Sequence, residues 1–355
     1  MQISRIIFTI LLFAVLSCNL KESEIVPILQ LDNTANPINQ IIPYPAKVTL
    51  PKDSTHHDTP IEWWYFNGNL HDISGEKYSY HFTVFQTEPD LDGAHPQVFH
   101  LSWNTHKTRS FIHDEKTFQY YGELSSSNIN FTVSSWEMSK SGETFYLFFN
   151  TSDTYIELEL TPVKPVVLHN DSGLVDMGIA GITYYYTYPL LNVSGTIRQN
   201  NTEQSLFGVS WMDHQWGDFL EEPPIGWSWM SIQLENQNEI MVAKVRNTET
   251  GEQIASYGTF INELGQATHL KSSDFTLIPT KIWVSNRTNL SYPIIWELSI
   301  PSLSTILNIS AITENSEFFG ENFVTQPYWE GATDITGIFK ETNMPGVGFM
   351  ELVGY

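Results

Sequence analysis

The chain has 355 residues, more than one typical domain, and its 40 acidic and 17 basic residues give a formal net charge of −23. This acidic balance argues against nucleic acid as a partner and against electrostatic docking on anionic lipid. Aromatic residues reach 14% and include 11 Trp, which suits a β-rich core or an apolar cavity.

The N-terminus has the pattern of an export signal. Arg5 is the only charged residue before position 21, and residues 6–16 form an almost entirely apolar run that is too short to span a bilayer comfortably. Val-Leu-Ser-Cys follows and resembles a bacterial lipobox, in which the cysteine is acylated and becomes the new N-terminus. We therefore predict a lipoprotein signal peptide at 1–17 and a lipid on Cys18. The alternative is an ordinary signal peptide with an incidental cysteine.

These features predict a place in the bacterial cell envelope, with the membrane as a partner through the lipid anchor. Asn19 is not the Asp that retains some lipoproteins in the inner membrane, so we expect the outer membrane, on its periplasmic side. Cys18 is the only cysteine of the chain, so the fold must rest on its core rather than on disulfides. Residues 18–43 are polar, include Pro27 and Pro37, and predict a flexible tether.

From residue 44 onward, apolar and polar residues alternate as in β-strands. In 155–160 the apolar residues point one way and two glutamates the other, and 145–149 precedes this strand across a turn, which predicts a hairpin. Further strands are expected at 240–245, 254–260, 78–86 and 98–103. No stretch after the signal keeps helical spacing, so the predicted fold class is all-β, as barrels or sandwiches.

Two adjacent prolines, Pro223 and Pro224, interrupt this pattern before a new strand begins near Trp227. We therefore predict two β-domains, at 44–220 and 225–355.

Three segments are dense in unusual residues: 56–68, 208–217 and 328–355. Together they resemble the AttH-like, hydroxyneurosporene-synthase-like family, which includes bacterial carotenoid 1,2-hydratases and many secreted proteins called hydrolases. The matching features are Glu-Trp-Trp-Tyr-Phe after His-X-Asp, Trp-Met-Asp-His-Gln-Trp-Gly, a Tyr-Tyr-Tyr run, and Tyr-Trp-Glu-Gly with a Gly-Tyr end. The resemblance covers residue 44 to the C-terminus. It implies two packed lipocalin-like β-barrels with an apolar cavity between or inside them, a fold that fungal Diels-Alderase-type pericyclases also share.

By this resemblance, His214 and Trp216 match the His-X-Trp pair in the pocket of the hydratases. On a strand these two side chains share one face, while Asp213 faces away, so the partner of His214 must come from another segment. Trp216 would stabilise a carbocation through its π face, and His214 would move a proton or orient a water molecule.

The sequence departs from the hydratases at their proposed acid. They place a Tyr and an Asp two apart on the next strand, whereas the strand around 241–243 has neither. This puts alkene hydration in doubt, since that reaction needs a positioned acid, and leaves Glu62, Asp213 and Glu330 as alternative acids. We predict His214, Asp213 and Glu62 as catalytic residues. The expected ligand contacts are Trp216, Trp64, Tyr185, Tyr328 and Glu330.

Each of these residues also has a structural reading. Trp64 suits core packing, Glu62 and Asp58 suit a structural charge pair or a helix or turn cap, and 213–216 suits a buried polar network between the barrels. His56 and His57 lack a third ligand pattern, so no metal site is predicted, and no cofactor is expected. The Gly-X-Ser-X-Gly elbow of serine hydrolases is absent from the sequence.

The predicted function is binding of a hydrophobic small molecule, an isoprenoid, polyene or lipid, with hydration or rearrangement in the pocket. The alternative is a non-catalytic lipocalin-like carrier, and a third reading is a structural envelope component. A positioned acid favours the enzyme, and an apolar pocket without one favours the carrier.

Replacing the lipid-bearing residue tests the anchor. Cys18→Ser is expected to leave the chain unprocessed and to abolish labelling by a fatty-acid probe in cells, because the thiol is the acylation point. Labelling that persists in Cys18→Ser would refute the lipoprotein assignment.

Overall fold

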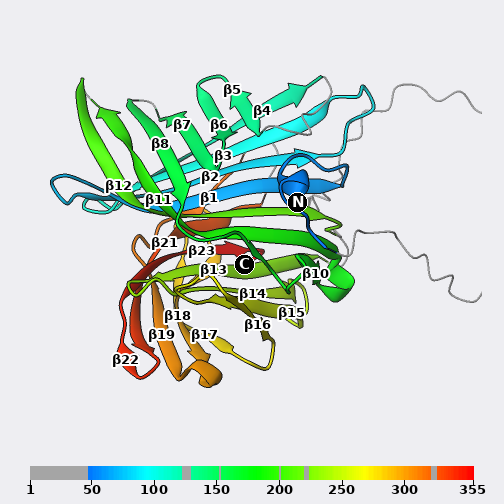
Figure 1. Ribbon diagram of the computed structural model, residues 1–355, viewed down its shortest axis with the longest axis vertical. Coiled ribbons are helices and arrows are strands. Elements are labelled where there is room, and N and C mark those ends of the chain that lie inside the picture. The colour runs from blue at the N-terminus through cyan, green and yellow to red at the C-terminus, as the bar shows by residue number, and fades with distance from the viewer. Residues whose placement is uncertain (1–46, 122–128, 152, 200, 220–223, 321–325) are drawn as a thin grey trace, which may run out of the picture. The chain divides into compact units, whose positions relative to one another are not determined.

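The protein is built almost entirely from antiparallel β-strands (Figure 1). The computed structural model describes residues 47–121, 129–151, 153–199, 201–219, 224–320 and 326–355, and Pro45–Tyr355 forms one compact unit. The predicted signal peptide, Cys18 and the tether up to residue 43 lie outside the described residues. Within these ranges, no helix is long and apolar enough to cross a membrane.

The first sheet has the strand order β4-β3-β2-β1-β12-β11-β8-β7-β6-β5, with β9 and β10 pairing with β11. Its strands are β1 (Ile61–Asp72), β2 (Lys77–Thr87), β3 (His95–Thr105), β4 (Ser110–Tyr120), β5 (Asn130–Val133), β6 (Trp136–Ser141), β7 (Thr144–Asn150), β8 (Thr154–Pro162), β9 (Val167–Leu168), β10 (Leu174–Asp176), β11 (Ile182–Gln199) and β12 (Thr202–Gly217).

The second sheet has the order β16-β15-β14-β13-β23-β21-β19-β18-β17, with β20 and β22 pairing with β21. Its strands are β13 (Ile225–Leu234), β14 (Glu239–Asn247), β15 (Gln253–Ile261), β16 (Ala267–Lys271), β17 (Thr276–Val284), β18 (Ser291–Ile300), β19 (Thr305–Ala311), β20 (Glu317–Phe318), β21 (Tyr328–Phe339), β22 (Thr342–Asn343) and β23 (Gly346–Val353). In the described part of the chain the helical segments are three short 3₁₀ turns, η1 (Lys52–Ser54), η2 (Gly178–Ala180) and η3 (Pro301–Leu303).

The predicted all-β fold with two lipocalin-like barrels is confirmed, since each sheet forms a nearly closed or half-closed barrel. The predicted hairpin is also present, because β7 pairs with β8 and Phe149 lies opposite Ile156. In β8 the side chains alternate strictly between buried and exposed, as the pattern in the sequence indicates. The first sheet ends at Gly217 and the second begins at Ile225. The exact domain boundaries, 44–220 and 225–355, stay a prediction.

The parts of β1 and β12 that face the second sheet, 64–68 and 210–217, are buried on both faces. β1 and β12 pair so that Trp64 lies opposite His214 and Tyr65 opposite Asp213. The even-numbered residues of this pair enter the interior of the first sheet, while Tyr65 packs with Trp229 of β13 in an apolar cluster shared by both sheets. Successive residues of β1 and β12 therefore belong to two different interiors.

A buried ion pair ties the first sheet to the second. The Lys164 ammonium, just after β8, donates to Glu239 Oε2 at 2.6 Å and to the carbonyl oxygen of Asn262 at 2.9 Å. Both charged side chains are almost fully buried. Burial raises the pKa of Glu239 to about 7, although its bond with Lys164 opposes that shift.

Removing one partner of this pair is expected to cost more than removing both. Lys164→Met should lower the free energy of unfolding by about 3–5 kcal/mol, because it leaves a carboxyl group buried without a cation. The double variant Lys164→Met/Glu239→Gln should recover much of that loss in urea denaturation. Equal destabilisation by the single and double variants would show that the pair is not coupled.

Candidate functional site

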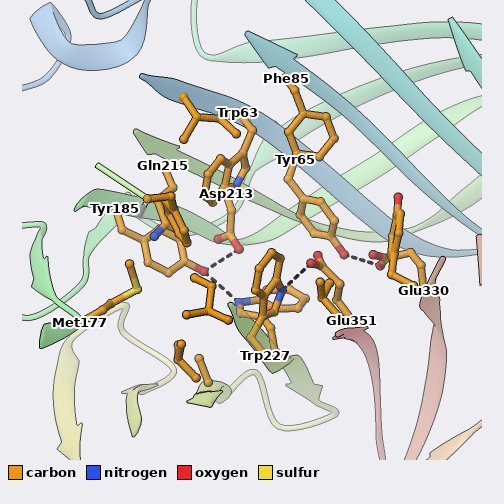
Figure 2. Close-up of a pocket in the computed structure, with 18 of the residues that line it drawn as sticks. Trp63, Tyr65, Phe85, Met177, Tyr185, Asp213, Gln215, Trp227, Glu330 and Glu351 are labelled. Carbon is orange, nitrogen blue, oxygen red and sulfur yellow. Dashed lines mark hydrogen bonds between the residues drawn. The ribbon is translucent and has the colours of Figure 1, made fainter. Parts of the chain in front are cut away.

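A cavity of about 300 Å³ lies between the two sheets and has an aromatic lining (Figure 2). Three acidic side chains enter it: Asp213 from β12, Glu330 from β21 and Glu351 from β23. Its aromatic lining is Trp63, Tyr65, His81, Phe85, Tyr185, Phe219, Trp227, Trp229, Tyr257 and Tyr328. We call this cavity the carboxyl pocket.

Two of the acids are neighbours across a strand pair, since Glu330 and Glu351 lie directly opposite each other in the register of β21 and β23. Tyr65 donates its hydroxyl hydrogen to Glu330 Oε1 at 2.7 Å, and the Trp227 indole N–H donates to Glu351 Oε1 at 2.6 Å (Figure 2). These bonds fix both carboxyl groups inside the pocket.

Both carboxyl groups are held toward their protonated forms. Burial raises the pKa of Glu330 well above its usual range, and the neighbouring charge of Glu351 raises it further. Burial also raises the pKa of Glu351 to about 7, against the opposing effect of its hydrogen bonds with Trp227 and Glu330. Two like-charged groups this close titrate as a pair, so the pair keeps at least one proton near neutral pH.

Asp213 is held by a chain of hydrogen bonds from both sheets. Tyr185 donates to Asp213 Oδ2 at 2.6 Å, and the Trp211 indole N–H donates to Oδ1 at 2.7 Å. Trp229 of the second sheet donates to the Tyr185 oxygen at 2.9 Å. Burial raises the pKa of Asp213 to about 7, although its bonds with Tyr185 and Trp211 lower it in part. Near neutral pH, this group can either give or accept a proton.

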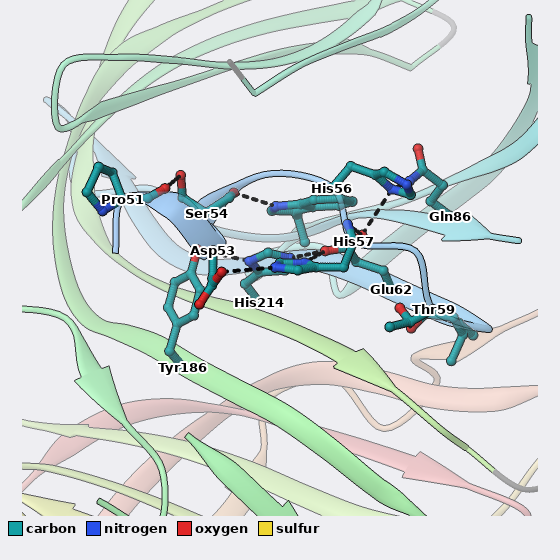
Figure 3. Close-up of polar contacts among 12 residues, drawn as sticks. Pro51, Asp53, Ser54, His56, His57, Thr59, Glu62, Gln86, Tyr186 and His214 are labelled. Carbon is teal, nitrogen blue, oxygen red and sulfur yellow. Dashed lines mark hydrogen bonds and ion pairs between the residues drawn. The ribbon is translucent and has the colours of Figure 1, made fainter. Parts of the chain in front are cut away.

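The opposite face of β12 carries a different cluster (Figure 3). His214 Nε2 lies 2.6 Å from Glu62 Oε1, and His57 Nδ1 lies 2.7 Å from the same oxygen. The other ring nitrogen of His214 contacts the Tyr186 hydroxyl at 2.9 Å. We call His57, Glu62 and His214 the histidine–glutamate cluster.

Aromatic rings enclose this cluster. The His57 ring stacks on Trp216 at 3.9 Å with an interplanar angle of 2°, and Trp64 stacks on His214 at 4.6 Å. Burial lowers the pKa of His57 to about 4 and that of His214 well below its usual range. Burial also raises the pKa of Glu62 well above its usual range.

A family model described as AttH-like matches residues 42–355 of the chain. The chain belongs to the AttH-like family. The resemblance predicted from the sequence motifs is therefore confirmed.

Solved structures with the same fold include an AttH protein from Nitrosomonas europaea and kievitone hydratase from Nectria haematococca. The AttH protein is 24% identical with a TM-score of 0.77, and the match covers 87% of this chain and 97% of that one. Kievitone hydratase is 16% identical with a TM-score of 0.72, and the match covers 89% and 94% of the two chains. Both likenesses establish the fold.

One curated relative is a dehydratase, AsqC, from Emericella nidulans, which is 23% identical over 236 residues. The match includes 64% of this AttH-like chain and spans 63% of the length of the dehydratase.

The structure divides the predicted site residues between the two faces of β1 and β12. Asp213, Tyr185, Tyr328 and Glu330 line the carboxyl pocket. The other four, Glu62, Trp64, His214 and Trp216, lie together in and around the histidine–glutamate cluster. The side-chain alternation predicted for 213–216 puts Asp213 on one face of β12 and both His214 and Trp216 on the other. Glu62, on another strand, is the partner expected for His214. Their catalytic and ligand-binding roles stay predictions.

Sequence reasoning missed Glu351 and its partner Trp227 as site residues. Glu351 lies on the face of β23 that also carries Phe349 and Val353, both of which contribute to the apolar surroundings of the pocket. A single acidic residue on the apolar face of a strand is the signal that would have identified it.

Because His214 faces away from the carboxyl pocket, its removal is expected to affect stability rather than ligand binding. His214→Ala should lower the free energy of unfolding by about 1–3 kcal/mol, the effect of removing a buried hydrogen-bond partner. Affinity for an uncharged apolar probe such as N-phenylnaphthylamine, measured by fluorescence, should remain that of the wild type.

Trp227→Ala, which removes part of the pocket wall, serves as the matched variant and should weaken probe binding. A His214→Ala protein that keeps its stability but loses probe binding would instead place His214 in the binding site, as the sequence motif suggests.

Proposed function

We propose that this AttH-like protein binds a hydrophobic small molecule in the carboxyl pocket and adds water to it, or removes water from it, by acid–base catalysis. The observation that carries the proposal is the opposed pair Glu330 and Glu351, two carboxyl groups held toward their neutral forms among aromatic rings. A neutral carboxylic acid in an apolar site is the kind of group that protonates an alkene or a hydroxyl leaving group.

In the hydration direction, Glu351 gives its proton to one alkene carbon, and the electron pair of the double bond forms the new C–H bond. The adjacent carbon becomes a carbocation, which the faces of Trp229 and Tyr65 stabilise. A water molecule adds to this carbon, and the Asp213 carboxylate accepts the proton that the water loses. Dehydration follows the same steps in reverse. Protonated Asp213 gives its proton to the hydroxyl group, which leaves as water, and the Glu351 carboxylate then takes a proton from the adjacent carbon.

The relatives support this class of reaction, since one is a hydratase and another a dehydratase by name. The apolar, aromatic lining and the cavity of about 300 Å³ support an isoprenoid, polyene or lipid-like ligand. We also propose that a lipid on Cys18 holds the chain at the bacterial outer membrane, on its periplasmic side. Hydrophobic ligands partition into that membrane, so the anchor would keep the pocket near them.

Replacing the proposed acid is expected to remove turnover while keeping the fold. Glu351→Gln preserves the shape of the side chain but cannot supply the proton, so hydration should slow by roughly 10²–10⁴-fold. The measurement is incorporation of ¹⁸O from labelled water into a panel of isoprenoid and polyene alkenes, read by mass spectrometry. In the wild type, the rate should fall as the pH rises above about 7, because the acid form of Glu351 is lost.

Glu157→Gln, on the exposed face of β8, is the control and should leave the rate unchanged. A wild-type protein that binds these alkenes but never incorporates the label would support the carrier function instead, which the apolar lining of the pocket also allows. Equal rates for wild type and Glu351→Gln would remove Glu351 from the mechanism.

A further inference from the structure

The histidine–glutamate cluster brings together three ligand atoms from separate segments of the chain. His57 Nδ1 comes from the segment before β1, Glu62 Oε1 from β1 and His214 Nε2 from β12, and all three lie within 4.8 Å of one another. From the sequence, His56 and His57 lacked a third ligand; the fold supplies Glu62 and His214. We propose that His57, Glu62 and His214 bind one divalent metal ion of the Zn²⁺ type.

The spacing of the three atoms suits a small cation. Ligand atoms bonded to Zn²⁺ at about 2.0–2.1 Å in tetrahedral geometry lie roughly 3.4 Å apart. Both imidazole nitrogens lie 2.6–2.7 Å from Glu62 Oε1, so each would have to move by less than about 1 Å. Two imidazole nitrogens and one carboxylate oxygen form a ligand set that suits Zn²⁺ and other transition metals rather than Mg²⁺ or Ca²⁺.

The surroundings of the two histidines resemble the outer contacts of metal-bound imidazoles. A metal-bound histidine usually places its other ring nitrogen against a hydrogen-bonding group, which fixes the ring orientation. His214 Nδ1 meets the Tyr186 hydroxyl at 2.9 Å, and His57 Nε2 lies 3.8 Å from Asp53 Oδ1. Stacking on Trp216 also fixes the orientation of the His57 ring.

Charge also favours a cation at this position. Among the residues that the structure describes, Glu62 has ion-pair contacts with histidines alone, namely His56, His57 and His214. The His57 backbone N–H also donates to Glu62 Oε2 at 2.8 Å, so hydrogen bonds offset part of the cost of burying this carboxylate, but none of its ion-pair partners in the described part of the chain is a lysine or arginine. A divalent ion would supply that charge.

Access to the proposed site is open on one side. His57 is 18% exposed and His56 19%, whereas His214 and Glu62 are almost fully buried. The His56 ring nitrogen Nδ1 lies 3.3 Å from Glu62 Oε2, next to the three ligands. An ion can therefore enter past these two partly exposed histidines, and a water molecule can complete its coordination.

The test uses the purified chain without a histidine tag, treated with a chelator and then dialysed. Zn²⁺ titration by calorimetry should give one tight site per chain, and Co²⁺ should give the intense visible absorption of a tetrahedral complex. His57→Ala, a half-buried position that should tolerate truncation, is expected to abolish the tight site. Asp53→Asn removes the charge beside His57 and should weaken binding by roughly 10–100-fold, and because Asp53 also accepts the backbone N–H of Thr49, this variant is included in the denaturation control.

His71→Ala is the matched control, since it removes an exposed histidine from the same strand as Glu62 and should leave the binding isotherm unchanged. Thermal denaturation of each variant without metal shows whether it is folded, and Glu62→Gln serves as a second ligand variant of unchanged shape. Absence of a tight site in the wild type, or equal Zn²⁺ binding by wild type, His57→Ala and Glu62→Gln, would overturn the proposal and leave the cluster as a hydrogen-bonded network.

Discussion

Residues 64–68 of β1 and 210–217 of β12 are buried on both faces, and this burial determines where the polar side chains of the protein can lie. In most antiparallel sheets one face meets water, and the polar residues of a strand can face solvent. Here residues 64–68 of β1 and 210–217 of β12 meet two interiors, so the charged residues of these stretches need partners within the protein. Asp213 has Tyr185 and Trp211, and His214, its neighbour in sequence, has Glu62 and Tyr186.

As a result, the carboxyl pocket and the histidine–glutamate cluster lie on opposite faces of the same strand, β12. The carboxyl pocket gathers acids from both sheets, and the hydrogen bonds from Tyr65 and Trp227 hold them in place. In the histidine–glutamate cluster, the imidazoles of His57 and His214 contact Glu62 on the inner face of the first sheet. Because neighbouring residues of β12 point to opposite faces, one short motif contributes to both sites.

Desolvation is the main cause of the shifted pKa values in both sites. Burial is the largest cause of the raised pKa values of Asp213, Glu330 and Glu351, and of the lowered values of His57 and His214. The same effect therefore favours neutral acids in one site and neutral imidazoles in the other. Neutral acids can donate protons to an apolar ligand, and neutral imidazoles are the form that binds metal ions.

The fold class, the family and the direction of individual side chains along a strand could be predicted from the amino-acid sequence. The alternation in 155–160 indicates a strand, and the spacing of Asp213, His214 and Trp216 shows which of them share a face. These are local properties, because the period of a β-strand is set by its own backbone. The folded structure was needed to show which face lines the pocket, that Glu351 lies opposite Glu330, and that Glu62 and His57 lie beside His214. Such contacts join residues far apart in the chain, and their register depends on how whole strands pair, which no local pattern specifies.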